Sequence, residues 1–253
     1  MNMRNTPNRF FRSKIFRKGY FKILVILIAG FTYLQTISAQ DTSPMNNCYC
    51  IEDSALSDFV GCDTTSFSNG SRLYRQFNCD SSWLVFEQND GTKKTMSSLQ
   101  KPMIEYTERL GYQFVKEYRR SLLFMNRQAS GGGFPVDFEL LSKDNAALIE
   151  NFGHIIYYSD DSINNYVLYL SSGNLDTLTF YNIDAEAKYF FPVPAGRLSK
   201  TVSESSVMFP EYLFDEPKIS ENILTIVYKY LISDAPEKWG TGKITIDLRK
   251  TMK

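Results

Sequence analysis

The sequence predicts an all-β protein, an antiparallel meander of about 12 short strands in a propeller-like or two-sheet sandwich arrangement, behind an N-terminal signal peptide. Three observations carry this expectation. Short runs rich in Tyr, Phe, Val, Ile and Leu follow one another from residue 72 onward, separated about every 8 to 12 residues by turn residues. Apolar residues at helical spacing are rare. The composition, 43% hydrophobic with 14 Gly and 9 Pro in 253 residues, is that of a globular chain and excludes disordered and collagen-like classes.

Residues 1–39 have the layout of a secretory signal peptide. They contain four Arg and three Lys but no acidic residue, and the apolar segment 23–34 is followed by small residues just before Gln40. A helix of 12 apolar residues spans about 18 Å, whereas the hydrocarbon core of a bilayer is about 30 Å thick. We therefore expect cleavage after Ala39 and a secreted or periplasmic protein. An uncleaved membrane anchor formed by residues 23–39 is the alternative.

Residues 40–71 are rich in Asp, Ser, Thr and Asn, which predicts a loop-rich leader. The four cysteines of the chain fall in or just after it: Cys48, Cys50, Cys62 and Cys79. An even number of cysteines in an exported protein predicts two disulfides, and their scattered spacing does not fit a zinc site. A bridge between Cys48 and Cys50 would be strained. Two arrangements are left open, Cys48 with Cys62 and Cys50 with Cys79, or the crossed pairing.

Residues 72–253 form the predicted all-β domain. Asn89-Asp90-Gly91 predicts a tight hairpin turn of two residues, because Asp-Gly accepts positive φ at both central positions. Two segments have a helical alternative, 102–110 and 146–152, since each carries apolar residues at helical spacing or a capping Asp before it. The expected strands are 72–77, 82–88, 92–98, 112–118, 121–126, 135–141, 146–152, 154–158, 165–171, 175–182, 187–192, 223–231 and 243–249.

A weak internal repeat bears on the choice between a propeller-like fold and a sandwich. Residues 137–152 and 177–192 lie 40 positions apart, and both consist of an apolar strand, a turn at an Asp and a second strand. A period near 40 residues with about four strands per unit is typical of propeller blades. Hairpins of any meander look alike, however, and two copies are few. The sequence therefore leaves a propeller-like fold and a two-sheet sandwich both open.

The charge distribution excludes one class of partner. The whole chain has 28 basic and 28 acidic residues, but residues 1–39 hold seven of the basic ones. The remainder therefore carries a net charge of −7. Because non-specific binding to DNA or RNA depends on clustered Lys and Arg, we expect no nucleic acid partner.

No motif assigns a catalytic residue, a cofactor or a metal. His154 is the single histidine and begins an apolar run, where a packed or surface histidine is the usual finding. Ser98–Lys101 matches a Ser-x-x-Lys pattern without its companion motifs. Residues 160–164 lack the Gly and the Glu of a calcium loop, and Gly131–Gly133 lacks the spacing of a dinucleotide site.

The segment 208–217 (MFPEYLFDEP) is the candidate ligand site, because it mixes aromatic rings with carboxylates. Rings that stack on sugars and carboxylates that bind hydroxyl groups would suit a glycan, and a pair of carboxylates could divide acid and base roles. Alternatively, the loop plugs its aromatic side chains into the core. The candidate ligand-binding residues are Phe209, Glu211, Tyr212, Phe214, Asp215 and Glu216.

Two classes of function follow. The first is an exported, non-catalytic binding or scaffolding protein whose partner is a cell-surface polymer or an envelope protein. The second is a carboxylate-based hydrolase acting on glycans. An aromatic-rich, exported β chain with an early cysteine cluster resembles bacterial cell-envelope proteins in general, and this resemblance transfers no functional residue.

Overall fold

The computed structural model describes residues 48–106, 110–128, 136–159, 164–171, 174–194, 196–232 and 235–252. Every described residue belongs to one compact unit, residues 45–253. The predicted signal peptide, Gly131–Gly133 and residues 160–163 lie outside the described residues. Within the described part of the chain, no helix is long and apolar enough to cross a membrane.

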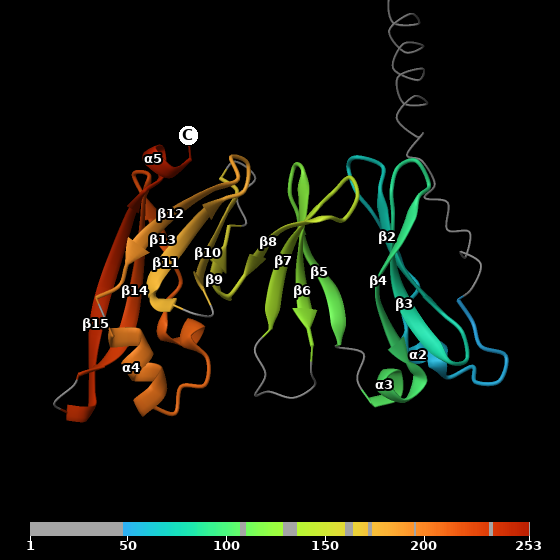
Figure 1. Ribbon diagram of the computed structural model, residues 1–253, viewed down its shortest axis with the longest axis horizontal. Helices are drawn as coiled ribbons and strands as arrows, with labels where there is room; N and C mark the ends of the chain where they lie inside the picture. Colours follow the sequence, from blue (N-terminus) through green and yellow to red (C-terminus); the bar gives the residue numbers. More distant parts are fainter. Residues whose placement is uncertain are drawn as a thin grey trace, which may run out of the picture. The chain divides into compact units, whose positions relative to one another are not determined.

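The predicted all-β, antiparallel fold is confirmed, with four sheets that each consist of strands consecutive in the chain (Figure 1). The first sheet has the order β1-β2-β3-β4, the second β5-β6-β7-β8, the third β12-β11-β10-β9 and the fourth β13-β14-β15. The strands are β1 (Thr64–Ser66), β2 (Arg72–Phe77), β3 (Ser81–Glu87), β4 (Lys93–Gln100), β5 (Gly111–Glu117), β6 (Ser121–Arg127), β7 (Asp137–Ser142), β8 (Leu148–Phe152), β9 (His154–Tyr158), β10 (Tyr166–Ser171), β11 (Asn174–Asn182), β12 (Ala187–Pro192), β13 (Lys218–Ser220), β14 (Ile223–Ile232) and β15 (Ala235–Asp247).

Short helices connect the sheets and flank them. They are α2 (Leu56–Phe59), α3 (Lys101–Tyr106), α4 (Arg197–Glu204), the 3₁₀ helix η1 (Pro210–Leu213) and α5 (Leu248–Thr251). The helical alternative for 146–152 is wrong, because β8 covers Leu148–Phe152. The alternative for 102–110 is correct in part, since α3 ends at Tyr106.

Consecutive sheets pack against each other face to face. One buried cluster joins the first sheet to the second, another joins the second to the third, and a third joins the third to the fourth. In β10, alternate residues enter different clusters: Leu168 faces the fourth sheet, whereas Val167 and Tyr169 face the second. Because side chains of a strand alternate between faces, β10 must be apolar on both sides, which explains its continuous run YVLYL.

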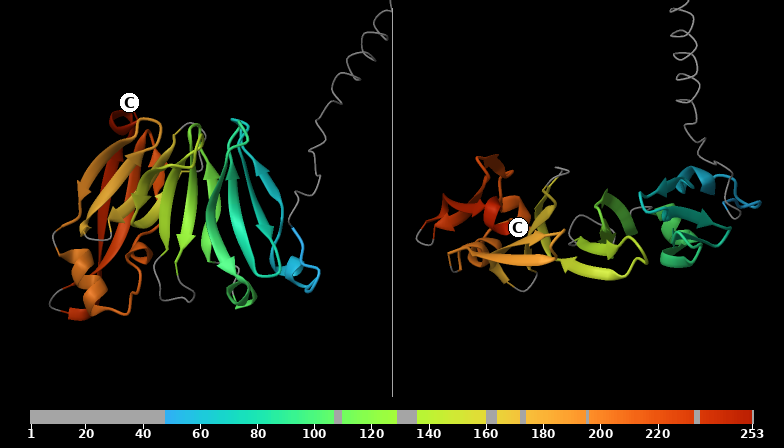
Figure 2. Two further views of the ribbon diagram at one scale, coloured as in Figure 1. Left: turned by 45° about the vertical axis from the view of Figure 1, so that its right-hand side comes forward. Right: turned by 90° about the horizontal axis from the view of Figure 1, so that it is seen from above.

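This stacking is propeller-like, because an inner sheet of the series is covered on both faces, whereas each sheet of a sandwich keeps one face in solvent. The four sheets follow one another in chain order within the unit (Figure 2). Among the described residues, no buried cluster joins the first sheet to the fourth.

The 40-residue repeat corresponds to real structural equivalence. Its two copies are β7 with β8 and β11 with β12, the last two strands of the second and third sheets. Both turns use one residue with positive φ at the same place, Ala146 at 51° and Glu186 at 52°. In each turn the side chain that ends the first strand, Ser142 or Asn182, accepts a hydrogen bond from the backbone N–H two residues later, at 3.2 and 3.1 Å.

The hairpin at Asn89–Gly91 differs from the prediction. The N–H of Gln88 donates to the carbonyl of Thr92 at 2.8 Å, which encloses a loop of three residues. Gly91 is the residue of this loop that has positive φ, at 85°. A three-residue loop with Gly in the left-handed region is the next most common hairpin connection after the two-residue turn.

One disulfide closes the leader on itself, and a second links it to the turn between β2 and β3 of the first sheet. Their pairing is Cys48 with Cys62 and Cys50 with Cys79, the first of the two arrangements that the sequence left open. Behind these bridges, Leu56 of α2 and Ile104 of α3 pack with Phe77 at the end of β2. The strand β1 also lies within residues 40–71 and pairs with β2.

Candidate ligand-binding sites

The predicted segment 208–217 lies against the face of the third sheet that packs on the fourth. Its centre is η1, which begins at Pro210, a residue whose fixed φ suits the first turn of a helix. Phe214 packs against the buried cluster of that face, and its ring centroid lies 5.8 Å from that of Tyr228. Tyr212 points outward with 74% exposure and contacts Phe209 edge to face. The segment therefore packs Phe214 against the core and presents the ring of Tyr212 to solvent.

The structure brings His154 to Glu211, a pair that the sequence did not predict. The Nδ1 atom of His154, at the start of β9, lies 3.1 Å from Oε2 of Glu211 on η1. That oxygen is buried and accepts no hydrogen bond within the described residues.

The other acidic residues of the segment do not converge with Glu211. Asp215 lies 3.4 Å from the Nζ atom of Lys229 on β14, and its N–H donates to the carbonyl of Val227. Glu216 is exposed. The six predicted residues therefore divide between the core, two ion pairs and the solvent, and they do not line one described pocket.

An open cleft of about 580 Å³ lies on the opposite face of the third sheet, beside β8. Tyr169 belongs to the cluster between the second and third sheets, whereas Phe214 packs on the cluster between the third and fourth, so the two candidate surfaces are on different faces. The cleft is lined by Glu150, Asn151, Gly153, Tyr169, Ser171, Thr177, Thr179, Lys188 and Phe190.

The floor of this cleft is formed by polar side chains that interact with one another. The Nζ atom of Lys188 lies 2.8 Å from Oε2 of Glu150, and this contact raises the pKa of Lys188. Burial raises the pKa of Tyr169, whose hydroxyl also interacts with Lys188 and Thr179. Tyr181 on β11 is buried and does not line the cleft; burial, together with the charge of Glu150, raises its pKa to about 12. The floor thus offers an ammonium group, a carboxylate and neutral hydroxyl groups, with its two opposite charges compensating each other.

Phe190 forms the apolar rim. It lies directly opposite Thr179 in the ladder between β11 and β12, and it is 65% exposed. The alternation of β12 explains its position, because Tyr189 and Phe191 pack on the buried cluster while Lys188 and Phe190 project from the other face. The sequence AKYFFP, with three aromatic residues in succession, does not show which of them faces outward. Nor could it reveal that Glu150, 38 positions before Lys188, lies across from it.

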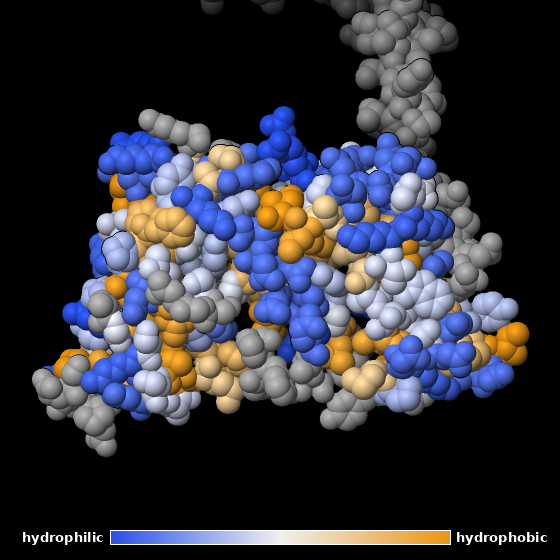
Figure 3. All heavy atoms as spheres, in the orientation of Figure 1, coloured by the Kyte–Doolittle hydropathy of each residue, from blue (hydrophilic) through white to orange (hydrophobic). Residues whose placement is uncertain are grey.

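Hydrophobic side chains at the surface do not gather in one large patch on the face that Figure 3 shows. On the face seen in Figure 3, hydrophobic side chains occur in small groups among hydrophilic ones. Within the described part of the chain, no group of three or more His, Cys, Asp or Glu side chains is placed to hold a metal ion.

Comparisons with known proteins do not assign this chain to a family. No family model and no curated protein matches the sequence. Among solved structures, a GH43 β-1,3-galactosidase matches with 6% identity over 72% of this chain and 41% of its own, at a TM-score of 0.24. A point mutant of the NanB sialidase from Streptococcus pneumoniae matches with 12% identity over 74% of this chain and 30% of its own, also at 0.24. This chain therefore spans less than half the length of either.

Proposed function

We propose that this protein is an exported, non-catalytic glycan-binding protein whose ligand occupies the cleft between Phe190 and the Glu150–Lys188 pair. The observation that carries the proposal is an exposed aromatic ring beside a row of hydroxyl, amide and charged groups in one open cleft. Aromatic rings bury apolar area at low entropic cost, and they stack on the C–H faces of sugar rings. Binding sites of this kind join an apolar surface to a few polar groups that set orientation.

The charges of the cleft favour a neutral glycan. Lys188 and Glu150 neutralise each other at 2.8 Å, so the floor has no net charge to attract an acidic polymer. Their remaining hydrogen-bonding positions, with Tyr169 and Thr179, match a ligand that both donates and accepts through hydroxyl groups. The open side of the cleft suits one or two units of a longer chain, such as a cell-surface polysaccharide.

The two disulfides are typical of an oxidising environment, which supports export to the periplasm or the medium. The predicted signal peptide 1–39 would provide the route. A partner at the cell surface or in the envelope is consistent with both.

A carboxylate-based hydrolase is the alternative. Such an enzyme needs two carboxyl groups about 5 to 10 Å apart across the scissile bond. Among the described residues that line the cleft, Glu150 is the one carboxylate, and its ion pair with Lys188 gives it a structural role. We therefore favour binding without turnover.

The test is a binding screen of the purified protein on immobilised neutral polysaccharides, run beside turnover of reporter glycosides. We expect Phe190→Ala to weaken retention about tenfold or more, as loss of a stacking ring does. Trp239→Ala is the matched control, because Trp239 is an exposed aromatic residue of β15 that does not line the cleft. Tyr212→Ala separates the two surfaces: loss in this variant with full retention in Phe190→Ala would move the site to residues 208–217. Turnover of a glycoside would replace binding by hydrolysis.

A further inference from the structure

The last strand of the fourth sheet, β15, has an uncovered edge. Among the described residues, this sheet has three strands where each of the other sheets has four, and β14 alone pairs with β15. Figure 1 shows β15 at the left of the described unit, beyond β14. The strand has 13 residues, whereas the edge strands β4, β8 and β12 have 8, 5 and 6. A long edge of this kind is a template for a further strand.

Two hydrogen bonds made by β14 show which backbone groups of β15 point outward. The carbonyl of Val227 accepts from the N–H of Asp215 at 2.9 Å. The N–H of Leu231 donates to the hydroxyl of Thr201, also at 2.9 Å. Val227 and Leu231 therefore direct their backbone groups away from β15. Val227 lies opposite Lys243, and in such a pair neither residue points at the other, so Lys243 directs its N–H and C=O away from β14.

The same alternation applies to Thr241 and Thr245, which lie two positions before and after Lys243. All three residues are exposed, and none of them forms a backbone hydrogen bond on the outer side with a described residue. The outer side of β14 differs, because β13, Asp215 and Thr201 occupy it. The outward N–H and C=O groups of Thr241, Lys243 and Thr245 thus form an open edge. It does not belong to the cleft beside Phe190.

The side chains along the open edge are basic. Residues 238–246 contain Lys238 and Lys243 but no acidic residue. Both lysines are exposed, and within the described part of the chain neither of them forms an ion pair. A second copy of β15 would bring lysines close to lysines, and like charges across a ladder are destabilising. An acidic strand would be attracted instead. The charges therefore favour an acidic partner over a second copy of this chain.

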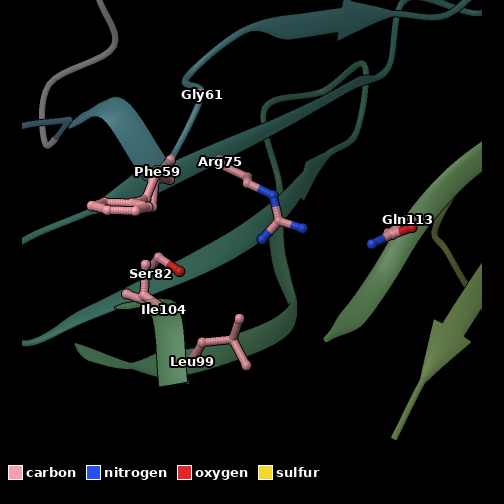
Figure 4. A pocket seen from close by; sticks show the side chains of 8 residues that line it. Phe59, Gly61, Arg75, Ser82, Leu99, Ile104 and Gln113 are labelled. Atoms are coloured by element: carbon pink, nitrogen blue, oxygen red, sulfur yellow. The ribbon is translucent and has the colours of Figure 1, made fainter. Parts of the chain in front are cut away.

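The cation in the hollow of about 290 Å³ beside the leader does not offer a comparable site. Figure 4 shows the side chain of Arg75 in this hollow, with Gln113 beyond it. The guanidinium of Arg75 donates to the carbonyl of Tyr112 at 3.3 Å, and Asp63 lines the adjoining hollow. Arg75 therefore interacts within the fold, whereas the open edge of β15 faces solvent.

We propose that the open edge of β15 binds an extended, acidic peptide segment of a partner protein, which becomes the fourth strand of the sheet. In strand addition of this kind, hydrogen bonds between main chains provide affinity and alternate side chains provide specificity. Acidic side chains at alternate positions of the peptide lie beside Lys243 on one face of the sheet, where pairs of opposite charge stabilise a ladder. A Pro in the middle of the segment prevents pairing, because it lacks the N–H that the ladder needs.

The test is fluorescence anisotropy of the purified protein with labelled synthetic peptides. They are the acidic TVEVEVT, its basic counterpart TVKVKVT, and TVEPEVT, in which Pro interrupts the strand. We expect saturable binding of the acidic peptide and at least about tenfold weaker binding of the other two. Lys243→Glu should weaken binding of the acidic peptide about tenfold and strengthen binding of the basic one, because it turns attraction into repulsion.

Thr241→Pro tests the backbone groups. It removes an N–H that points away from β14, a position that tolerates Pro at a sheet edge, and it should abolish binding of the acidic peptide. Arg119→Glu is the matched control, because it changes the net charge as Lys243→Glu does but lies in the exposed turn between β5 and β6. It should leave both affinities unchanged. Thermal melts of each variant establish that it is folded.

Amide hydrogen exchange locates the peptide independently of any variant. The acidic peptide should slow exchange of the N–H groups of Thr241, Lys243 and Thr245. Equal binding of the acidic and basic peptides, an unchanged preference in Lys243→Glu, or protection elsewhere in the chain would overturn the proposal. A dimer seen by sedimentation of the wild type, and dissociated by Thr241→Pro, would replace the acidic partner by a second copy.

Discussion

The two faces of the third sheet both carry aromatic residues, which are buried on one face and exposed on the other. Phe180 and Phe190 lie on adjacent strands, one row apart in the ladder. Phe180 is completely buried between the third and fourth sheets, where its ring stacks on that of Tyr166 at 4.8 Å. Phe190, on the other face, is 65% exposed above a floor of hydroxyl groups and an ion pair.

The difference lies in what covers each face. The fourth sheet lies over the first face and removes it from water, so its aromatic residues stabilise the fold. The other face is covered by the second sheet in part, and beyond the edge of that contact it opens as the cleft. An aromatic residue at this opening is available to a ligand and adds little to stability. Mutations at equivalent residues on the two faces should therefore separate stability from binding.

The largest contrast is expected between Phe180→Ala and Phe190→Ala. Removing the buried ring should lower the free energy of unfolding by about 3 to 5 kcal/mol, because it leaves a cavity between packed sheets. Removing the exposed ring should change it by less than about 0.5 kcal/mol. Urea denaturation of both variants, followed by circular dichroism, measures the two values. Similar losses in both would show that the faces are not energetically distinct.

A second, smaller contrast lies within the segment 208–217. Phe214→Ala should cost about 1 to 3 kcal/mol, since its ring is partly buried against Tyr228. Tyr212→Ala should cost less than about 0.5 kcal/mol, because Tyr212 is 74% exposed. The denaturation midpoints of the two variants measure this difference in stability. A large loss for Tyr212 would mean that its contact with Phe209 holds η1 in place.

The smallest expected effect concerns the ion pair on the cleft floor. Lys188→Met should lower stability by about 0.5 to 1 kcal/mol at pH 7, because the pair is partly solvated. The pKa of Lys188 is raised above 10.5 in the folded protein, so the contribution of the pair is complete below that pH. It is lost as the pH rises through the folded-state pKa.

The stability difference between wild type and Lys188→Met should therefore shrink at strongly alkaline pH. Ionisation of tyrosines also destabilises the fold there, since the pKa of Tyr181 is raised to about 12, but this loss is largely common to both proteins. Thermal melts of the pair at pH 7 and above pH 11 provide the measurement. A difference that grows with pH would contradict the assigned direction.

Much of the fold could be predicted from the sequence because its strands are local patterns. The bounds of β2, β9 and β12 agree with the predicted runs residue for residue. The strands that were missed, β1 and β13, have three residues each, all exposed, and so lack the apolar alternation that marks a strand. The start of β15 was missed because residues 235–242 are mostly polar or glycine.

The candidate sites could be predicted less well, because each one joins residues far apart in the chain. The pair of His154 and Glu211 spans 57 positions, and the pair of Glu150 and Lys188 spans 38. The segment 208–217 was singled out from the sequence because it mixes aromatic and acidic residues. Its division into a buried Phe214 and an exposed Tyr212 depends on where β14 lies, which no local pattern states.

The sequence by itself determined the strand-rich class, the hairpin repeated after 40 residues and the restriction of the cysteines to two pairings, because these follow from periodicity, turn residues and short chain separations. The tertiary structure alone decided which pairing forms, which face of each sheet is covered and where a cleft remains open. These outcomes depend on contacts between whole sheets. Whether Phe180 or Phe190 is buried is decided by which face the next sheet covers, and not by the residue itself.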